Sequence, residues 1–419
     1  MRPGAAVWSL YRGAGRLAAP LAGLHLARRA RRGKEDPARL AEKRGDIVPP
    51  PGPAPIWLHA VSVGESVAAL ALAERLIGEG FAVLMTTGTP TAAARIAAAG
   101  VPVTHRYAPL DAPPFVARFL DRVRPAAALF TESEVWPATI DALARRGVPR
   151  AQVNARMSAR SFASWRRLAP ISRPLFAQIP LVLAQSPAEA ARWRALGVGE
   201  AHATGNLKFD APPPPPDPAA LVALRAAIGG RPVWLAASLH PGEEEAVIAA
   251  HRAIAAARPD ILTIIAPRHP ETAGRVTAAA GEIALARRSR GETPDAPIYL
   301  ADTMGEMGTL FSLAPVVFLG ASLVPLGGHN PAEPAAFGAA ILTGPSHGAM
   351  FAPFLDAGAA RLVADGPALA AAVLVLLGDD RAREGAGQSA QTVLDAERGA
   401  VARTMAGLAG VLAAARARQ

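Results

Sequence analysis

Apolar stretches alternate with amphipathic ones along most of the chain beyond residue 50. The stretch from Pro55 to Val61 predicts a buried strand, and the stretch from Ser66 to Glu79 predicts a helix. The same pattern predicts strands over 81–87, 126–131 and 149–154, and helices over 90–99, 115–123 and 138–146. Strands that alternate with helices are typical of a parallel sheet covered on both faces. The first half of the chain is therefore predicted to form an α/β domain.

A proline-rich segment from Ala211 to Pro218 interrupts this alternation. Proline cannot continue a helix or a central strand, so the segment predicts a stiff, extended connector. Beyond it the pattern restarts, with strands predicted over 233–237, 261–266, 298–301, 316–319 and 340–343 and a helix over 243–256. We therefore expect an α/β protein with two doubly wound, Rossmann-like domains that face a central cleft. The last stretch, Ala396 to Arg418, predicts one long Ala-rich helix that packs across the domain junction.

These patterns divide the chain into four parts. We predict a basic N-terminal segment over 1–48, a first Rossmann-like domain over 49–210, a linker over 211–218, and a second Rossmann-like domain over 219–419 that includes the C-terminal helix. Ligands of open parallel sheets bind outside the carboxyl ends of the strands. Residues that carry chemistry are therefore expected in the loops that directly follow strands.

Composition narrows the class of protein. The chain has 419 residues, 51% of them hydrophobic, which is enough for two domains with their own cores. It contains no cysteine, which excludes disulfides, thiolate metal sites and a cysteine nucleophile. The net charge is +10, but residues 1–50 hold eleven Lys or Arg against four acids. Since most of the positive charge is local to the N-terminus, we expect no nucleic-acid partner.

The basic N-terminal segment has the pattern of a membrane-associated element. The apolar stretch over 5–27 contains Arg12 and Arg16, which lie one helical turn apart, so it is not an uninterrupted spanning segment. It is expected to lie in the membrane interface with these arginines among lipid headgroups, although a spanning arrangement stays open. The cluster from Arg28 to Lys34 favours an anionic membrane surface on the cytoplasmic side. The alternative is a basic helix that packs on the protein itself.

The loop after the first predicted strand carries a carboxylate at the opening of a helix. Gly64 permits a tight turn, and Glu65 then faces the expected cleft. The helix N-terminus favours a negative charge there, which suits a general base that takes a proton from an alcohol. The alternative is that Glu65 only complements the helix N-terminus.

Two further loops of the first domain carry charged side chains. Glu132 and Glu134 follow a predicted strand together with Trp136, and either acid could orient an acceptor. Glu134 could instead cap the helix that Pro137 opens. Lys208 precedes the connector, where the alternative is an ordinary surface lysine.

The second domain carries three candidate loops for a nucleotide. Arg268 and His269 end a predicted strand and offer a guanidinium for a phosphate or carboxylate. The turn over 302–306 could hold a base or phosphate with its amides. Gly327 and Gly328 permit close approach of the backbone to a phosphate, and 330–333 then open a helix. In that helix Asn330 can serve as a cap and Glu333 can accept hydrogen bonds from ribose hydroxyls.

Several catalytic classes lack their sequence patterns. There is no D-x-D pair beside an apolar strand end, no H-E-x-x-H spacing and no G-x-x-x-x-G-K-[ST] loop. Kinase, ATPase and zinc hydrolase functions are therefore not favoured. We expect chemistry without a metal or a cofactor; a nucleoside monophosphate leaving group would need less charge neutralisation than a diphosphate.

Five motifs together resemble the family of 3-deoxy-D-manno-octulosonic acid (Kdo) transferases of Gram-negative bacteria. These enzymes move Kdo from CMP-Kdo to a lipid A precursor, and the motifs occur here in order along nearly the whole chain. They are His59-Ala60-Val61-Ser62-Val63-Gly64-Glu65, Gly205-Asn206-Leu207-Lys208-Phe209-Asp210, Pro267-Arg268-His269-Pro270-Glu271, Asp302-Thr303-Met304-Gly305-Glu306 and Gly327-Gly328-His329-Asn330-Pro331-Ala332-Glu333-Pro334.

The resemblance implies a GT-B fold, with the acceptor in the N-terminal domain and the CMP moiety in the C-terminal one. It implies that Glu65 is the catalytic base and that Glu132 and Lys208 stabilise the transition state. It also implies inversion at the anomeric carbon and a location on the cytoplasmic face of the inner membrane. The residues implied to hold CMP-Kdo are Arg268, His269, Met304, Gly305, Glu306, Asn330, Pro331, Ala332 and Glu333. The family's Ser-Thr-His segment reads Ser238-Leu239-His240 here, so position 239 has no hydroxyl.

Two other functions remain as alternatives. One is a GT-B transferase that uses a UDP-sugar on another membrane lipid, which competition between CMP and UDP would separate. The other is a catalytically silent α/β scaffold that binds anionic lipid through its basic N-terminus. The number of Kdo residues transferred stays open.

Overall fold

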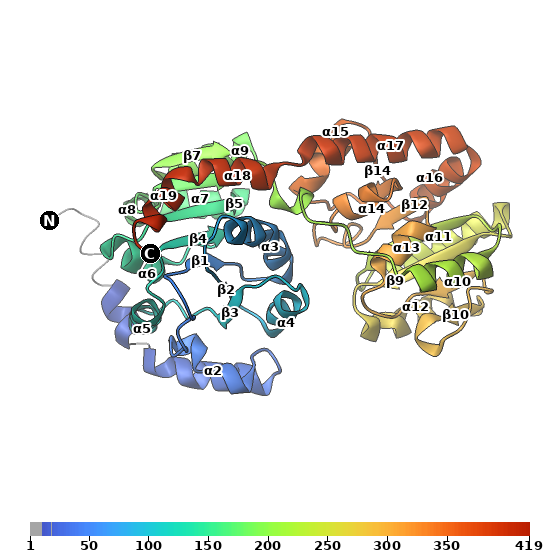
Figure 1. The fold of residues 1–419 in the computed structure, drawn as a ribbon. Helices are drawn as coiled ribbons and strands as arrows, with labels where there is room; N and C mark the ends of the chain where they lie inside the picture. Colours follow the sequence, from blue (N-terminus) through green and yellow to red (C-terminus); the bar gives the residue numbers. More distant parts are fainter. Residues whose placement is uncertain (1–10, 18) are drawn as a thin grey trace. The chain divides into compact units, whose positions relative to one another are not determined.

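The protein is described by a computed structural model over residues 11–17 and 19–419. Its contacts divide the chain into two compact units. The described residues up to Ala211 and those over Glu397–Gln419 form the N-terminal unit, and Pro212–Ala396 form the C-terminal unit. Each unit is a parallel sheet with helices on both faces (Figure 1).

The N-terminal unit contains a seven-stranded sheet in the order β3-β2-β1-β4-β5-β6-β7, in which every pair is parallel. The direction of strand addition reverses between β1 and β4, which is where open α/β sheets bind ligands. The strands are β1 Ile56–His59, β2 Val83–Thr87, β3 Thr104–Tyr107, β4 Ala127–Thr131, β5 Arg150–Ala155, β6 Leu181–Ala184 and β7 Glu200–Ala203.

Successive residues of β1 show how the two faces of this sheet are filled. Ile56 and Leu58 pack in a core with α3 and the C-terminal helices, whereas Trp57 packs in a second core with α5 and α6. The α-helices of the unit are α2 Ala22–Arg31, α3 Val63–Gly78, α4 Pro90–Ala98, α5 Pro113–Val123, α6 Pro137–Arg145, α7 Ala159–Arg167, α8 Ala169–Phe176, α9 Pro187–Leu196, α18 Ala400–Gly407 and α19 Ala409–Arg416. Its 3-10 helices are η1 Ala19–Leu21, η2 Pro37–Arg39, η3 Glu42–Arg44 and η4 Leu207–Phe209.

The C-terminal unit repeats this architecture, with the sheet order β10-β11-β9-β8-β12-β13-β14 and parallel pairs throughout. Its strands are β8 Val233–Leu239, β9 Leu262–Pro267, β10 Leu285–Arg287, β11 Ile298–Leu300, β12 Val316–Leu319, β13 Ala340–Thr343 and β14 Ala360–Leu362. Its helices are α10 Pro218–Ile228, α11 Glu244–Ala257, η5 Pro270–Thr272, α12 Ala273–Ala280, η6 Arg288–Arg290, α13 Met307–Leu313, α14 Ala332–Ala336, η7 Ala349–Phe351, α15 Ala352–Asp356, α16 Gly366–Gly378 and α17 Asp380–Glu397.

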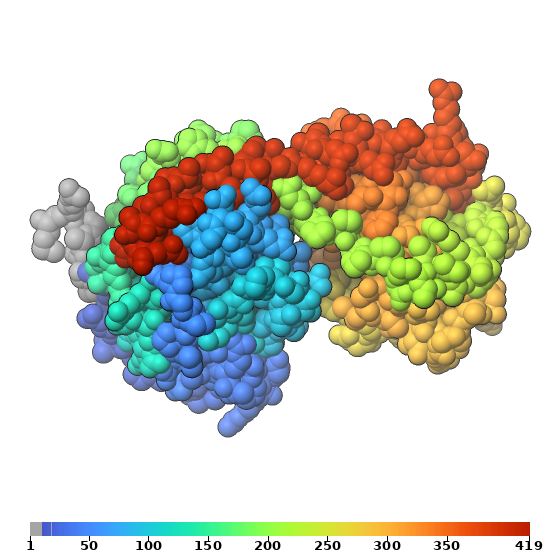
Figure 2. All heavy atoms as spheres, in the orientation of Figure 1, coloured from blue at the N-terminus to red at the C-terminus, as the bar shows by residue number. Residues whose placement is uncertain are grey.

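The prediction of one continuous helix over Ala396–Arg418 is wrong. Helix α17 ends at Glu397, and Gly399 takes a left-handed conformation with φ +87° before α18 begins. The chain breaks again at Leu408, between α18 and α19. The contacts group Glu397–Gln419 with the N-terminal unit, where α18 packs against α3. In Figure 2 these C-terminal residues, in red, cover part of the surface of that unit.

The N-terminal segment packs on its unit through charged contacts. Arg12 lies 3.2 Å from Asp141 in α6, as the alternative of a segment that packs on the protein itself would require. The exposed side chains of Leu17, Leu21 and Leu24 lie before or within α2. Within the described part of the chain, no helix is long and apolar enough to cross a membrane. The part of the predicted interfacial segment before residue 11 lies outside the described residues.

Asp210 ties the C-terminal segment to the rest of the N-terminal unit. Its carboxylate accepts hydrogen bonds from Gly399 N at 2.6 Å and from Val401 N at 2.5 Å, so it caps α18 from 189 residues away. A helix N-terminus leaves such amides without intrahelical partners. The Asp210 side chain therefore determines where α18 begins.

We expect Asp210→Ala to loosen the C-terminal segment, because loss of a cap costs about 0.5–2 kcal/mol. Amide hydrogen exchange should become faster in α18 and α19. The control is Asp217→Ala, which removes the cap of α10, where Asp217 accepts from Ala219 N and Ala220 N. In that variant only α10 should exchange faster, and unchanged exchange in α18 of the Asp210 variant would contradict this role.

Candidate active site at the carboxyl ends of the strands

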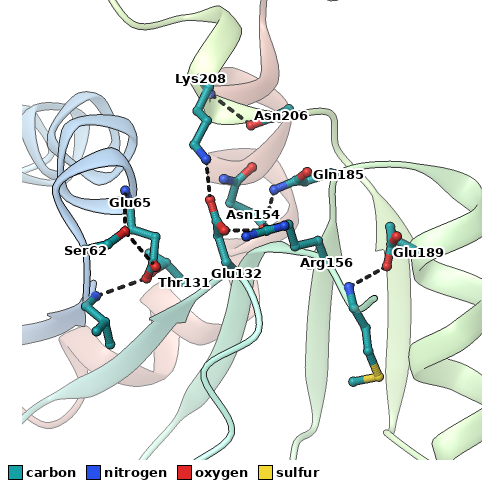
Figure 3. A network of polar contacts seen from close by, with 12 residues as sticks. Ser62, Glu65, Thr131, Glu132, Asn154, Arg156, Gln185, Glu189, Asn206 and Lys208 are labelled. Carbon is teal, nitrogen blue, oxygen red and sulfur yellow. Dashed lines mark hydrogen bonds and ion pairs between the residues drawn. The ribbon is translucent and has the colours of Figure 1, made fainter. Parts of the chain in front are cut away.

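Glu65 is held at the carboxyl end of β1 by three donors from its own surroundings. Val61 N donates to Glu65 Oε2 at 3.0 Å, and the Ser62 hydroxyl donates to Oε1 at 2.9 Å. Ser62 Oγ in turn accepts from Glu65 N, which is the pattern of a capping box at the start of α3. The Thr131 hydroxyl lies 3.1 Å from Glu65 Oε2 and 3.0 Å from the carbonyl oxygen of His59. The carboxylate is thus oriented on three sides and stays partly exposed (Figure 3).

Glu132 is a second carboxylate at the same edge, but its environment is different. It directly follows β4 in a left-handed conformation with φ +50°, and its side chain is only 2% exposed. Arg156 Nε donates to Oε2 at 2.5 Å, and Lys208 Nζ forms an ion pair with Oε1 at 2.7 Å. Burial alone would raise the pKa of Glu132, but the charges of Lys208 and Arg156 outweigh burial and hold this pKa below its usual value. The structure therefore brings together the predicted pair, Glu132 and Lys208.

Glu134 completes a group of three acids on neighbouring loops. Trp136 Nε1 donates to Glu134 Oε2 at 2.6 Å. Burial raises the pKa of Glu134, and the negative charges of Glu65 and Glu132 raise it further. Of the three acids, only Glu132 has cations as direct partners among the described residues.

The alternative that Glu134 caps the helix opened by Pro137 is wrong. The first amides of α6 are taken by Asp111, which comes from the loop before α5. Its carboxylate accepts from Ala138 N at 3.0 Å and from Thr139 N at 2.8 Å. Glu134 is consequently left to bond Trp136 at the carboxyl edge.

Two residues near this site were not predicted. Arg156 directly follows β5, and Asn154 lies near the end of that strand in a left-handed conformation with φ +49°. Asn154 Oδ1 accepts from Leu207 N at 3.0 Å, so β5 is joined to the 3-10 helix that carries Lys208. The rule that chemistry follows strand ends, applied to β5, would have identified Arg156.

His59 lies beneath Glu65 in a buried network. Trp57 Nε1 can only donate, and it donates to Thr86 Oγ1 at 2.8 Å. The Thr86 hydroxyl is also the hydrogen-bond partner of His59 Nδ1, at 2.8 Å. The ring packs edge-on against Trp136 with centroids 5.1 Å apart. Burial lowers the pKa of His59 to about 3.

In the C-terminal unit, Arg268 and His269 follow β9 as predicted. Arg268 N donates to the Leu239 carbonyl at 2.9 Å, so this loop is bound to the end of β8. The His269 ring lies 6.0 Å from His240, which stacks on His329 with centroids 5.2 Å apart. Burial, and next the charge on His240, lower the pKa of His329 to about 4. His240 and His329 were not predicted as site residues.

The predicted turn Met304-Gly305-Glu306 lies between β11 and α13. Met304 is 66% exposed, and Gly305 is left-handed with φ +87°. Glu306 accepts from Arg288 Nη2 at 2.6 Å and from its Nε at 2.9 Å. The Glu306 side chain is thus engaged by the protein, while Met304 and Gly305 are exposed residues.

Asn330 through Glu333 open α14 in the loop after β12. Asn330 Oδ1 accepts from the main-chain N of Ala332, the first residue of α14, at 3.0 Å, while Pro331 occupies the N-cap position. Pro331 and Ala332 are buried, and Glu333 is partly exposed in the first turn of the helix. Among the described residues, no group of three or more His, Asp or Glu side chains could hold a metal ion.

Glu243 binds the main chain of the two loops that follow β8 and β12 through its carboxylate. Its side chain is completely buried, and each carboxylate oxygen accepts two main-chain hydrogen bonds. Oε2 accepts from His240 N at 2.9 Å and Ala321 N at 2.7 Å, and Oε1 accepts from Ser322 N and Leu323 N at 2.9 Å each. The ends of β8 and β12 are therefore held together by one side chain.

We expect Glu243→Gln to destabilise the C-terminal unit by about 2–4 kcal/mol, because the amide NH₂ would face two main-chain donors in a buried site. Binding of CMP should weaken in parallel, as measured by calorimetry, and hydrogen exchange should become faster after β8 and β12. Glu245→Gln, at an exposed position of the same helix, is the control. Equal stability of the Glu243 variant and the wild type would contradict the role of Glu243.

The neutral state of His59 predicts an acid sensitivity of the N-terminal unit. Because the pKa of His59 is about 3 in the folded unit, this side chain takes up a proton near pH 6.5 only in the unfolded chain. Stability is therefore lost as pH falls from about 6.5 towards 3, by up to about 1.4 kcal/mol per pH unit from this group. His59→Gln should make the urea unfolding midpoint of the unit less dependent on pH between about 6.5 and 5. An unchanged pH dependence would show that His59 is charged in the fold.

Comparisons with known proteins agree on one family. A family model described as 3-Deoxy-D-manno-octulosonic-acid transferase (kdotransferase) matches residues 28–211. A 3-deoxy-D-manno-octulosonic acid transferase from Bordetella pertussis is 36% identical and covers 92% of this chain and 95% of its own. A protein of the same name from Haemophilus influenzae is 34% identical and covers 88% of this chain and 90% of its own.

A solved structure agrees with the fold. The glycosyltransferase from Rickettsia africae covers 86% of this chain and 99% of its own, with a TM-score of 0.58 at 13% identity. At that identity the likeness concerns the fold alone, and it confirms the predicted GT-B class. Because both relatives are more than 30% identical over most of their own length and most of this chain, this chain belongs to the Kdo transferase family of glycosyltransferases.

Proposed function

We propose that the protein transfers Kdo from CMP-Kdo to a lipid A precursor in lipopolysaccharide biosynthesis, with inversion at the anomeric carbon and without a metal ion. The observation that carries the proposal is the orientation of Glu65 by Val61, Ser62 and Thr131 at the carboxyl end of β1. A partly exposed carboxylate in a fixed position is suited to take a proton from an alcohol.

In the proposed reaction, Glu65 accepts the proton of an acceptor hydroxyl while the oxygen attacks the anomeric carbon of Kdo. The bond between that carbon and the phosphate oxygen breaks, and CMP leaves with the electron pair. Attack opposite to the leaving group inverts the configuration. The donors on Glu65 fix the direction of its free lone pairs, which reduces the entropy cost of aligning base and hydroxyl.

Glu132 and Lys208 supply the proposed transition-state stabilisation. The carboxylate of Glu132 holds two cations, Lys208 and Arg156, side by side at the edge of the sheet. Negative charge develops on the phosphate oxygen as CMP leaves, and a preorganised cation stabilises it more than it stabilises the ground state. The buried Glu132 keeps both cations in position.

The proposed CMP contacts lie in the C-terminal unit. Arg268 offers its guanidinium to the phosphate, and the exposed turn at Met304 and Gly305 offers its main-chain groups. At the start of α14, Glu333 offers its carboxylate to the ribose hydroxyls.

We further propose that residues 1–48 bind the protein to the cytoplasmic face of the inner membrane. Leu17, Leu21 and Leu24 are between 68% and 83% exposed, and the last turn of α2 carries Arg28, Arg29 and Arg31. Exposed leucines beside a cluster of arginines suit an anionic lipid surface. The same surface would deliver a phosphorylated glycolipid acceptor.

We expect Glu65→Gln to lower kcat for Kdo transfer about 10²- to 10⁴-fold with little change in KM, since glutamine keeps the shape but cannot take the proton. The assay uses CMP-Kdo and a tetraacylated lipid A precursor in detergent with EDTA. Glu79→Gln is the matched control, because Glu79 ends the same helix at the opposite edge of the sheet.

Inhibition by CMP rather than UDP should accompany the activity of the wild type. If the wild type transferred no Kdo where the Haemophilus influenzae relative does, the assignment of donor and acceptor would fail. If Glu65→Gln retained full activity, the assignment of the base would fail while the family stayed the same.

A further inference from the structure

Arg156 has binding capacity that the ion pair with Glu132 does not use. The guanidinium uses Nε for Glu132, and within the described residues its two terminal nitrogens donate no hydrogen bond. The Arg156 side chain is 56% exposed, whereas the Glu132 side chain it touches is 2% exposed. A guanidinium presents its donors in a planar fork that matches the two oxygens of a carboxylate. The outer edge of Arg156 is therefore open to an anionic ligand.

The ion pairs fix Arg156 in place. Glu132 pairs with both Arg156 and Lys208, and the charges of Glu132, Glu65 and Glu189 keep Arg156 protonated. Charge-assisted, bidentate pairs between a guanidinium and a carboxylate are among the strongest hydrogen-bonded contacts in proteins.

A buried donor without a partner lies next to the same group. Asn154 is 1% exposed, its Oδ1 is used by Leu207 N, and its Nδ2 has no hydrogen-bond partner within the described residues. Strands β4 and β5 pair through Thr131 and Val153, so Glu132 and Asn154 are the next residues in register. Figure 3 shows the Asn154 amide beside the Glu132 carboxylate. An unsatisfied buried amide is costly and is a feature of binding sites.

The backbone at this position is strained in a way that suits a site. Glu132 and Asn154 are both left-handed, with φ +50° and +49°, although neither is glycine. Such conformations cost about 1–3 kcal/mol each and cluster at functional sites. They occur here at the ends of two adjacent strands: Glu132 directly follows β4, and Asn154 is the second-last residue of β5.

We propose that Arg156 binds the carboxylate of a Kdo residue and selects for it. The proposal rests on the proposed function, because Kdo is an ulosonic acid whose carboxylate is attached to the anomeric carbon. A neutral sugar would leave the outer edge of Arg156 without a partner. The carboxylate belongs either to the donor Kdo or to a Kdo already present on the acceptor, and both have the same chemistry.

The experiment separates this role from that of a mere partner of Glu132. Arg156→Lys keeps a positive charge beside Glu132 but loses the planar fork, and Arg156→Gln loses both. Arg145→Gln is the matched control, since Arg145 is 59% exposed, pairs with Asp141, and ends α6 at the opposite edge of the same sheet. Steady-state transfer is measured with the full chain, with CMP-Kdo varied first and then acceptors with and without a first Kdo.

We expect Arg156→Lys and Arg156→Gln to raise KM for the Kdo-bearing substrate about 10- to 100-fold, with a smaller change in kcat. A rise in KM for CMP-Kdo would identify the donor carboxylate, and a rise only for the acceptor that carries Kdo would identify that of the acceptor. If Arg156→Lys matched the wild type in every KM, or if both variants changed kcat alone, the proposal would be overturned.

A binding measurement decides the matter without turnover. Free Kdo and its C1 carboxamide are compared by ligand-observed NMR on the wild type and on Arg156→Lys. The wild type should favour the carboxylate at least about tenfold, and the variant should lose this preference. Equal binding of both probes by the wild type would overturn the role of Arg156. If the wild type transferred no Kdo, the proposed function would fail, and this comparison would still test Arg156.

Discussion

Main-chain N–H groups that emerge at the carboxyl edges of the two parallel sheets have no partners inside the sheets, and carboxylates accept their hydrogen bonds. Glu243 accepts four of them, Glu65 takes the amide of Val61, and Glu189 takes that of Met157 at 2.6 Å. A buried amide without a partner costs as much as a lost hydrogen bond. The positions of the functional loops therefore depend on a few acidic side chains.

The same edge places acids in different electrostatic environments, which separates their roles. Glu132 is buried between two cations that lower its pKa, so it stays charged and holds Lys208 and Arg156 in place. Glu65 is oriented by neutral donors and stays partly exposed, which suits the role of base proposed for it. Neighbouring carboxylates whose surroundings differ in this way are typical of sites that divide electrostatic and proton-transfer work.

The sequence predicts this architecture well where burial alone decides it. The central strands β12 and β13 were predicted with their observed bounds, because both faces are covered and the runs are apolar. The edge strands β3, β7, β10 and β14 were missed because they are short and carry no apolar run of that length. The interior strand β6, Leu181–Ala184, was missed although its sequence is apolar and largely buried. Contacts between residues far apart in the sequence could not be predicted either: Asp111 caps α6, and Asp210 caps α18. Gly399 breaks the C-terminal helix. A glycine at this position indicates a helix end, but the prediction of one continuous helix gave more weight to the Ala-rich composition.

The most direct test of the account is chemical rescue of the catalytic carboxylates. In Glu65→Ala the donors of Val61 and Ser62 remain, and the truncated side chain leaves room for a small carboxylate to bind them. In Glu132→Ala the lost carboxylate is one that, in the proposed mechanism, takes no proton from the substrate. Added formate should restore Kdo transfer to the Glu65 variant in a concentration-dependent way and should leave the Glu132 variant inactive. Rescue of Glu132→Ala, with none for Glu65→Ala, would contradict the assignment of Glu65 as the base.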